Sequence, residues 1–174
     1  ANRVAINNGR LSLGGQNLTV WAAGPPAACI STGANDALVA TAAETVTVYG
    51  NVDFSAGGNN LTPASSLFSF TGANTTLNAP QETFANFQLT KSAAGNTLTL
   101  ASSTAISGTL SVDTGVLTLA AYTLTVSAPV SLNSANGTIH LDNASSSLAL
   151  GANALSVTTG LLNHDLGAIT AGSL

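Results

Sequence analysis

Apolar and small polar residues alternate along most of the chain, and this alternation has the period of a β-strand with one buried face. Gly, Asn, Ser and Ala, which favour tight turns, lie between the alternating stretches. Pairs of apolar residues separated by one residue occur, for example, at Val46/Val48, Val52/Phe54, Val130/Leu132 and Ile139/Leu141. The pattern predicts an all-β chain of short strands, with these side chains pointing inward: Leu11, Leu13, Leu18, Val20, Leu98, Leu100, Leu110, Val112, Leu117, Leu119, Leu124, Val126, Leu148, Leu150, Leu155 and Val157.

One stretch, residues 34–45, fits a short amphipathic helix of about two turns. It contains Asp36, Leu38 and Glu44 among several alanines. The β-branched Thr45 and Val46 disfavour any extension of this helix.

Three segments share one ten-residue pattern. The sequences LSLGGQNLTV at 11–20, LTLAAYTLTV at 117–126 and LALGANALSV at 148–157 all read L-x-L, four turn residues, then L-x-V. The first two also align backward without a gap, residues 6–9 with residues 112–115. Such self-similarity is typical of repeat architectures.

The strands expected from this pattern are short and closely spaced, which favours a solenoid. A β-sandwich, the alternative, usually has longer strands at wider spacing. We therefore predict a parallel β-solenoid with about 20 residues per coil and about eight or nine coils. We expect this solenoid to form a single elongated β-repeat domain over 1–174, with a non-repeat insertion at about 21–45.

The segment 66–89 holds all the phenylalanines except Phe54, and Pro63 and Pro80 punctuate this part of the chain. Aromatic rings fill more space than leucine, so we expect a wider coil here or a loop that folds over the rod. An aromatic ligand cleft is the alternative interpretation of Phe68, Phe70, Phe84 and Phe87.

Charged residues make up 6% of the chain and hydrophobic residues 45%, so hydroxyl and amide side chains must cover the surface. The net charge is −4, and the cations are Arg3, Arg10 and Lys91. Three scattered cations argue against nucleic acid and against an anionic membrane surface as partners. No apolar run approaches the roughly 18 residues that a membrane span needs.

The chain lacks Met and begins at Ala1, which fits a mature chain after signal removal or a fragment of a longer one. Its single cysteine, Cys29, rules out an internal disulfide and a zinc cluster with several Cys ligands. We favour a small buried thiol at Cys29 over an intermolecular bridge.

Several short motifs recur between residues 66 and 126: Phe70-Thr71-Gly72, the T-F-x-x-F-x-L block at 83–89, and the Gly-led steps at 108–110 and 115–117. On these motifs the chain resembles the repeat regions of large secreted bacterial surface proteins, the filamentous haemagglutinin-like and autotransporter-type β-helical adhesins. Residues 21–45 do not fit the likeness. The resemblance implies a right-handed parallel β-helix, export, and a role in adhesion, matrix or filament formation, and it carries over no catalytic residue.

Two His–Asp pairs are the main candidates for chemistry. His140 and Asp142 share the outward face of an expected strand, and His164 adjoins Asp165 in a loop-like stretch. Either pair could bind a metal or polarise a nucleophile, but a solvated surface pair is the favoured interpretation. Polysaccharide-active β-helix enzymes need clustered carboxylates, usually with cations, whereas the acids here are spread along the chain. We therefore assign no catalytic residue.

Two further kinds of site are weaker. Calcium ligation by Asp36, Glu44 and Asp53 would require the 21–45 insertion to fold back. N-x-S/T triplets, the acceptor motif for N-glycosylation, occur at Asn17, Asn74, Asn136, Asn143 and, in a weaker form because of Pro63, at Asn60. We assign no metal-ligating or cofactor-binding residue.

These observations favour an extracellular structural protein, a subunit or segment of a surface filament or matrix fibre that assembles through its ends. Its expected partners are copies of itself, head to tail, or flanking repeats of a longer chain. The alternative is an adhesin stalk at the cell surface that binds a glycan or a protein through residues 21–45 or the Phe-rich segment. A polysaccharide-active enzyme is a remote third hypothesis.

Overall fold

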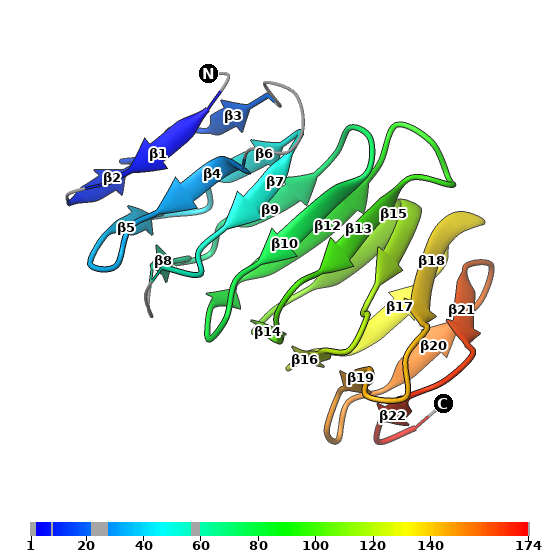
Figure 1. Ribbon diagram of the computed structural model, residues 1–174. Helices are drawn as coiled ribbons and strands as arrows, with labels where there is room; N and C mark the ends of the chain where they lie inside the picture. Colours follow the sequence, from blue (N-terminus) through cyan, green and yellow to red (C-terminus); the bar gives the residue numbers. More distant parts are fainter. Residues whose placement is uncertain (1–2, 8, 22–27, 57–59, 174) are drawn as a thin grey trace.

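The computed structural model describes residues 3–7, 9–21, 28–56 and 60–173. These residues wind into a parallel β-solenoid of about seven turns without a helix. Figure 1 shows the strands stacked in sequence order, with the two chain ends at opposite ends of the stack. Each pairing between described strands is parallel, as in β1–β4, β12–β15 and β19–β22. The prediction of an all-β parallel solenoid is confirmed, and the β-sandwich alternative is wrong.

Each full turn contributes one strand to each of three faces. The first face consists of β1 (Val4–Ile6), β4 (Ala28–Thr32), β7 (Asn51–Asp53), β10 (Thr75–Asn78), β13 (Thr97–Leu100), the end of β15 (Leu110–Thr118), β18 (Asn136–Leu141) and β21 (Leu161–His164). The second face consists of β3 (Leu18–Val20), β6 (Thr45–Val48), β9 (Leu67–Phe70), β12 (Asn86–Thr90) and the start of β15. A separate two-stranded sheet, β17 (Val130–Leu132) and β20 (Leu155–Val157), continues this face next to β15.

The third face is built from two separate parallel sheets. The first holds β2 (Arg10–Ser12), β5 (Ala37–Val39) and β8 (Leu61–Thr62). The second holds β11 (Thr83–Phe84), β14 (Thr104–Ile106), β16 (Thr123–Val126), β19 (Ser147–Ala149) and β22 (Ala168–Thr170).

Strand β15 belongs to two faces. Its residues 110–114 pair with β12 on the second face, and its residues 116–118 pair with β13 on the first. Gly115 lies between these halves with φ 104, a backbone conformation that favours glycine. A Cβ on Gly115 would lie 2.5 Å from Cγ of Lys91, so a larger residue would also collide with that side chain.

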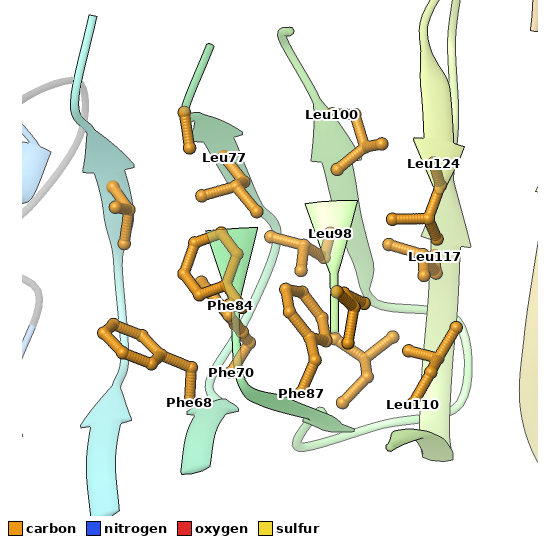
Figure 2. Close-up of a cluster of buried hydrophobic side chains, with 14 of the residues drawn as sticks. Phe68, Phe70, Leu77, Phe84, Phe87, Leu98, Leu100, Leu110, Leu117 and Leu124 are labelled. Carbon is orange, nitrogen blue, oxygen red and sulfur yellow. The ribbon is translucent and has the colours of Figure 1, made fainter. Parts of the chain in front are cut away.

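The core consists of columns of inward side chains in register from coil to coil. In the middle coils, Phe68, Phe70, Phe84 and Phe87 are at most 1% exposed and pack on one another (Figure 2). The rings of Phe70 and Phe87 stack with centroids 4.6 Å apart, and the Phe68 and Phe84 rings meet edge to face at 4.9 Å. The four rings therefore fill the core of these coils, and the alternative of an aromatic ligand cleft is wrong.

Most side chains predicted to point inward are buried, and the exceptions lie in the terminal coils. Leu11, Leu13 and Leu18 are half-buried and pack against the core from the first coil. Val157 is 45% exposed, which corrects its prediction as a core residue. It pairs with buried Leu132 on one side, but none of the described strands covers its other side.

Residues 28–45 form part of the repeat, in contrast to the predicted insertion at 21–45. Leu38 of β5 is fully buried and pairs with Leu11 before it and Leu61 after it. The short helix considered for residues 34–45 is also wrong, because Leu38 continues an inward column that a helix would break. Residues 22–27 of the predicted insertion lie outside the described residues.

Coil length varies more than the sequence pattern suggested. A hydrogen bond between neighbouring coils joins Ser103 and Thr123, 20 residues apart, whereas another joins Asn17 and Thr45, 28 residues apart. Because most coils are longer than the predicted 20 residues, the chain makes about seven turns instead of eight or nine.

Candidate functional site

Two of the buried acids hold the backbone of the preceding coil. The Asp36 carboxylate, 5% exposed, accepts a short hydrogen bond from the Gly9 N–H. The Glu44 carboxylate, 2% exposed, accepts N–H bonds from Thr41 (3.0 Å), Ala42 (2.7 Å) and Gly15 (2.9 Å). These bonds, led by the one from Thr41, lower the pKa of Glu44 to about 2.

Asp53, the third acid considered for calcium, forms separate contacts. Its Oδ1 accepts hydrogen bonds from the Ser55 N–H at 3.0 Å and from Nδ2 of Asn78 at 3.3 Å. Within the described ranges, no group of three or more His, Cys, Asp or Glu side chains is arranged to hold a metal ion.

Glu82 connects coils in the same way as Asp36 and Glu44. It is 2% exposed, and its Oε1 and Oε2 accept the N–H groups of Asn60 (2.6 Å) and Leu61 (3.0 Å). Burial raises the pKa of Glu82, although the two N–H donors act in the opposite direction. The carboxylate thus carries a structural role and lies at the edge of the third face.

Lys91 and Cys29 are buried near the corner between the second and first faces. The Lys91 Nζ donates to the Thr75 hydroxyl at 2.5 Å and to the Thr71 carbonyl at 3.2 Å. Burial lowers the pKa of Lys91 to about 8. Cys29 is 1% exposed, in line with the prediction of a buried thiol, and burial raises its pKa.

The structure pairs the candidate histidines differently from the sequence. His140 Nε2 lies 2.8 Å from Oδ2 of Asp165, on the neighbouring coil, instead of pairing with Asp142. His164 Nε2 lies 3.1 Å from the Gly167 carbonyl oxygen. The His140–Asp165 pair is partly solvated, with side-chain exposures of 26% and 59%. This arrangement is a partly exposed hydrogen-bonded pair that joins two coils.

Two asparagines in glycosylation motifs, Asn17 and Asn74, accept hydrogen bonds from the backbone of the next coil. Asn17 Oδ1 accepts the Thr45 N–H at 2.7 Å, and Asn74 Oδ1 accepts the Thr97 N–H at 2.9 Å. Asn143 Oδ1 bonds within its own turn, to the Ser145 N–H at 2.9 Å. At these positions the amide oxygen has a structural role.

The third face carries an open groove of about 310 Å³ across β11, β14 and β16. Known ligand pockets begin at about this size, roughly 300 Å³. Hydroxyl side chains dominate its walls, and the lining residues are Gln81, Glu82, Thr83, Ser103, Thr104, Ala105, Thr123 and Thr125. The sequence pattern does not reveal this groove, because its residues come together only through the register of three successive coils.

A second surface feature is aromatic. The rings of Trp21 and Tyr49 stack face to face at the corner after β3 and β6, with centroids 3.8 Å apart and planes inclined by 15°. Trp21 is 49% exposed. The stack extends the pairing of the two strands, since the Tyr49 N–H donates to the Val20 carbonyl at 3.0 Å.

No protein-family model, curated protein or solved structure matches this chain. The similarity to haemagglutinin-like repeats is therefore an interpretation of the sequence motifs. The described part of the chain also contains no helix that is long and apolar enough to cross a membrane.

Proposed function

We propose that this chain is an extracellular structural protein, a subunit or segment of a surface filament or matrix fibre that lengthens by stacking coil on coil. The observation that carries this proposal is the apolar surface of the last coil. Val157, Leu162 and Ile169 continue the inward columns of the buried Leu132, Ile139 and Leu148. Val157 is 45% exposed, and Leu162 and Ile169 are half-buried.

The backbone of the last coil supports the same proposal. Strand β21 pairs with β18, and β22 pairs with β19, each on one side within the described part of the chain. The other edge of each strand presents backbone groups that can template a further parallel strand. A following coil, from a longer chain or from a second copy, would satisfy these groups and bury Val157, Leu162 and Ile169.

The buried acids favour a scaffold over an enzyme. Asp36, Glu44 and Glu82 are each occupied by backbone N–H groups of the preceding coil. Polysaccharide-active enzymes need carboxylates that are free to act on substrate and lie close together. Such an arrangement suits a protein whose acids stabilise its own stack.

Sedimentation of the native chain over a range of concentrations tests the assembly. We expect association that changes little between low and high salt, because few charges are present to be screened. Val157→Lys should weaken it by placing a charge on the stacking surface, because Val157 continues the inward column of Leu132. Ser131→Lys, at an exposed position on the side of the stack in β17, is the matched control and should leave it unchanged. A chain that stays monomeric at high concentration would contradict assembly between copies.

A glycan-binding adhesin stalk is the second candidate, and the groove on the third face favours it. Hydroxyl groups and methyl groups line the groove over three successive strands, without Lys or Arg. Both candidate functions imply that the chain is secreted and lies at the cell surface.

A further inference from the structure

The groove on the third face arises from three residues in register. Thr83 of β11, Ala105 of β14 and Thr125 of β16 are consecutive partners on parallel strands. Both threonines are exposed and Ala105 is half-buried, while the residues that follow them on β14 and β16, Ile106 and Val126, point into the core. With neighbouring strands about 4.8 Å apart, the two threonines stand roughly 10 Å from each other and the alanine methyl forms a notch between them.

The polar groups of the groove have free hydrogen-bonding capacity. They are the exposed hydroxyls, since Glu82 is buried and its two oxygens accept the N–H groups of Asn60 and Leu61. Each threonine hydroxyl can both donate and accept. Apolar groups, among them the methyl groups of Ala105, Thr83 and Thr125, form the larger part of the lining surface between these polar groups.

This chemistry selects among ligand classes. The lining contains neither Lys nor Arg, which disfavours an anionic ligand, and it contains no aromatic ring for a planar one. The carboxylate of Glu82 is 2% exposed, so it offers little to a bulky cation. A neutral sugar matches the lining because its hydroxyls pair with hydroxyls and its C–H faces meet methyl groups. We propose that this groove binds a neutral polysaccharide that lies along the solenoid axis.

The pattern continues along the same face, as a polymeric ligand would require. Thr125 pairs with Ala149 of β19, and Ala149 pairs with Thr170 of β22. The outward column from β11 to β22 thus alternates threonine and alanine, with a period of two coils, or about 10 Å. A chain of sugar rings running along the axis would meet a second notch at Ala149 after the first at Ala105.

Filling the notch tests the proposal without touching the core. Ala105→Leu places a larger side chain between Thr83 and Thr125 and should lower glycan affinity by about tenfold or more. Ser131→Leu, on β17 of the second face, makes a similar change at an exposed site and should keep the affinity. Because the groove lies on the side of the stack, Ala105→Leu should sediment like the unchanged chain, which separates this test from that of assembly.

A second pair of variants removes hydroxyls without adding bulk. The double variant Thr83→Ala/Thr125→Ala should also weaken binding, by about thirtyfold, since each of the two lost hydrogen bonds contributes roughly 1 kcal/mol. Thr76→Ala/Thr99→Ala, on paired strands of the first face, is its matched control and should bind normally.

The probe is an array of immobilised neutral and anionic glycans, followed by calorimetric titration with the soluble neutral oligosaccharide that binds best. Circular dichroism of every variant checks that the fold is retained. We expect neutral glycans to bind the unchanged chain and both control variants, and to bind Ala105→Leu weakly. The proposal is overturned if no neutral glycan binds, if anionic glycans bind better, or if folded Ala105→Leu binds as well as the unchanged chain.

Discussion

The amino group of Lys91 lies inside the solenoid, 2.5 Å from the hydroxyl of Thr75 on the preceding coil. Lys91 is 4% exposed, and within the described ranges its Nζ has no carboxylate partner at salt-bridge distance. A buried ammonium group without a counter-ion loses solvation that two neutral acceptors restore in part. The side chain therefore opposes folding while it is charged.

Replacing Lys91 by methionine should raise the free energy of unfolding at pH 7. Methionine keeps the length of the side chain and removes the buried charge. We expect a gain of about 1–3 kcal/mol, reduced by the bonds lost at Thr71 and Thr75. Urea unfolding of both proteins measures the difference. A clear loss of stability would show that the two hydrogen bonds outweigh the charge.

The same lysine predicts a rise in stability at alkaline pH. Its pKa is about 8 in the folded chain and near 10.5 when unfolded, so the unfolded state binds more protons between these values. Stability should therefore increase as pH rises from about 8 toward 10.5. The buried Cys29 thiol, with its raised pKa, acts in the opposite direction above pH 9.0. The comparison belongs in a Cys29→Ala background, in which the rise should vanish on adding Lys91→Met.

Glu44 and Glu82 should affect acid stability with opposite signs. The lowered pKa of Glu44 contributes stability above pH 4.5, which is lost as pH falls toward 2. The raised pKa of Glu82 means that its folded form holds a proton more tightly than the unfolded chain, so its contribution declines as pH rises above 4.5. Thermal melts of Glu44→Gln should show a weaker loss on acidification than the unchanged chain, and Glu82→Gln a stronger one.

Leu119 provides a test of the inward columns. It is fully buried, so Leu119→Asp should destabilise the chain by several kcal/mol, because it places a charge in the core. Ala121→Asp, at an exposed position two residues later, is the control and should change the free energy of unfolding by at most about 0.5 kcal/mol. Equal melting temperatures for the two variants would contradict the inward orientation of Leu119.

Gly137 tests the close approach between coils. A Cβ at this position would lie 1.9 Å from the Val112 carbonyl oxygen of the preceding coil, so Gly137→Ala must push two backbones apart. We expect a marked fall in melting temperature. Gly95 has open space around its Cα and serves as the control, since Gly95→Ala meets no atom within 4 Å. Similar melts for both variants would contradict this packing.

The sequence predicts which way a side chain points better than it predicts which residues that side chain contacts. Alternation places Leu117 and Leu119 inward whatever the register, and both are fully buried. The contact between His140 and Asp165 depends on the length of the coil between them, which the turns determine and the alternation does not reveal. The groove at Ala105 was missed for the same reason.

Local composition favours the wrong secondary structure around Leu38. The alanines around Leu38 have a high helix propensity. In the structure, however, Leu38 lies in a strand, and its register partners in the core lie one coil away, at Leu11 and Leu61. Column packing of this kind overrides local propensity. The exposure of Val157 is a related case, because alternation cannot say whether a further coil covers a residue.

Strand β15 has a consequence for the order in which the solenoid comes apart. Each coil contacts mainly its neighbours, so thermal unfolding should begin at the terminal coils and advance inward one coil at a time. At nine residues β15 is the longest of the described strands, and it pairs with β12, β13 and β18. Separating β15 from its partners disrupts the pairing on two faces at once, so β15 should slow unfolding that advances from either end. Its amide hydrogens should be among the slowest to exchange with deuterated solvent, and the amides of β2 and β22 among the fastest.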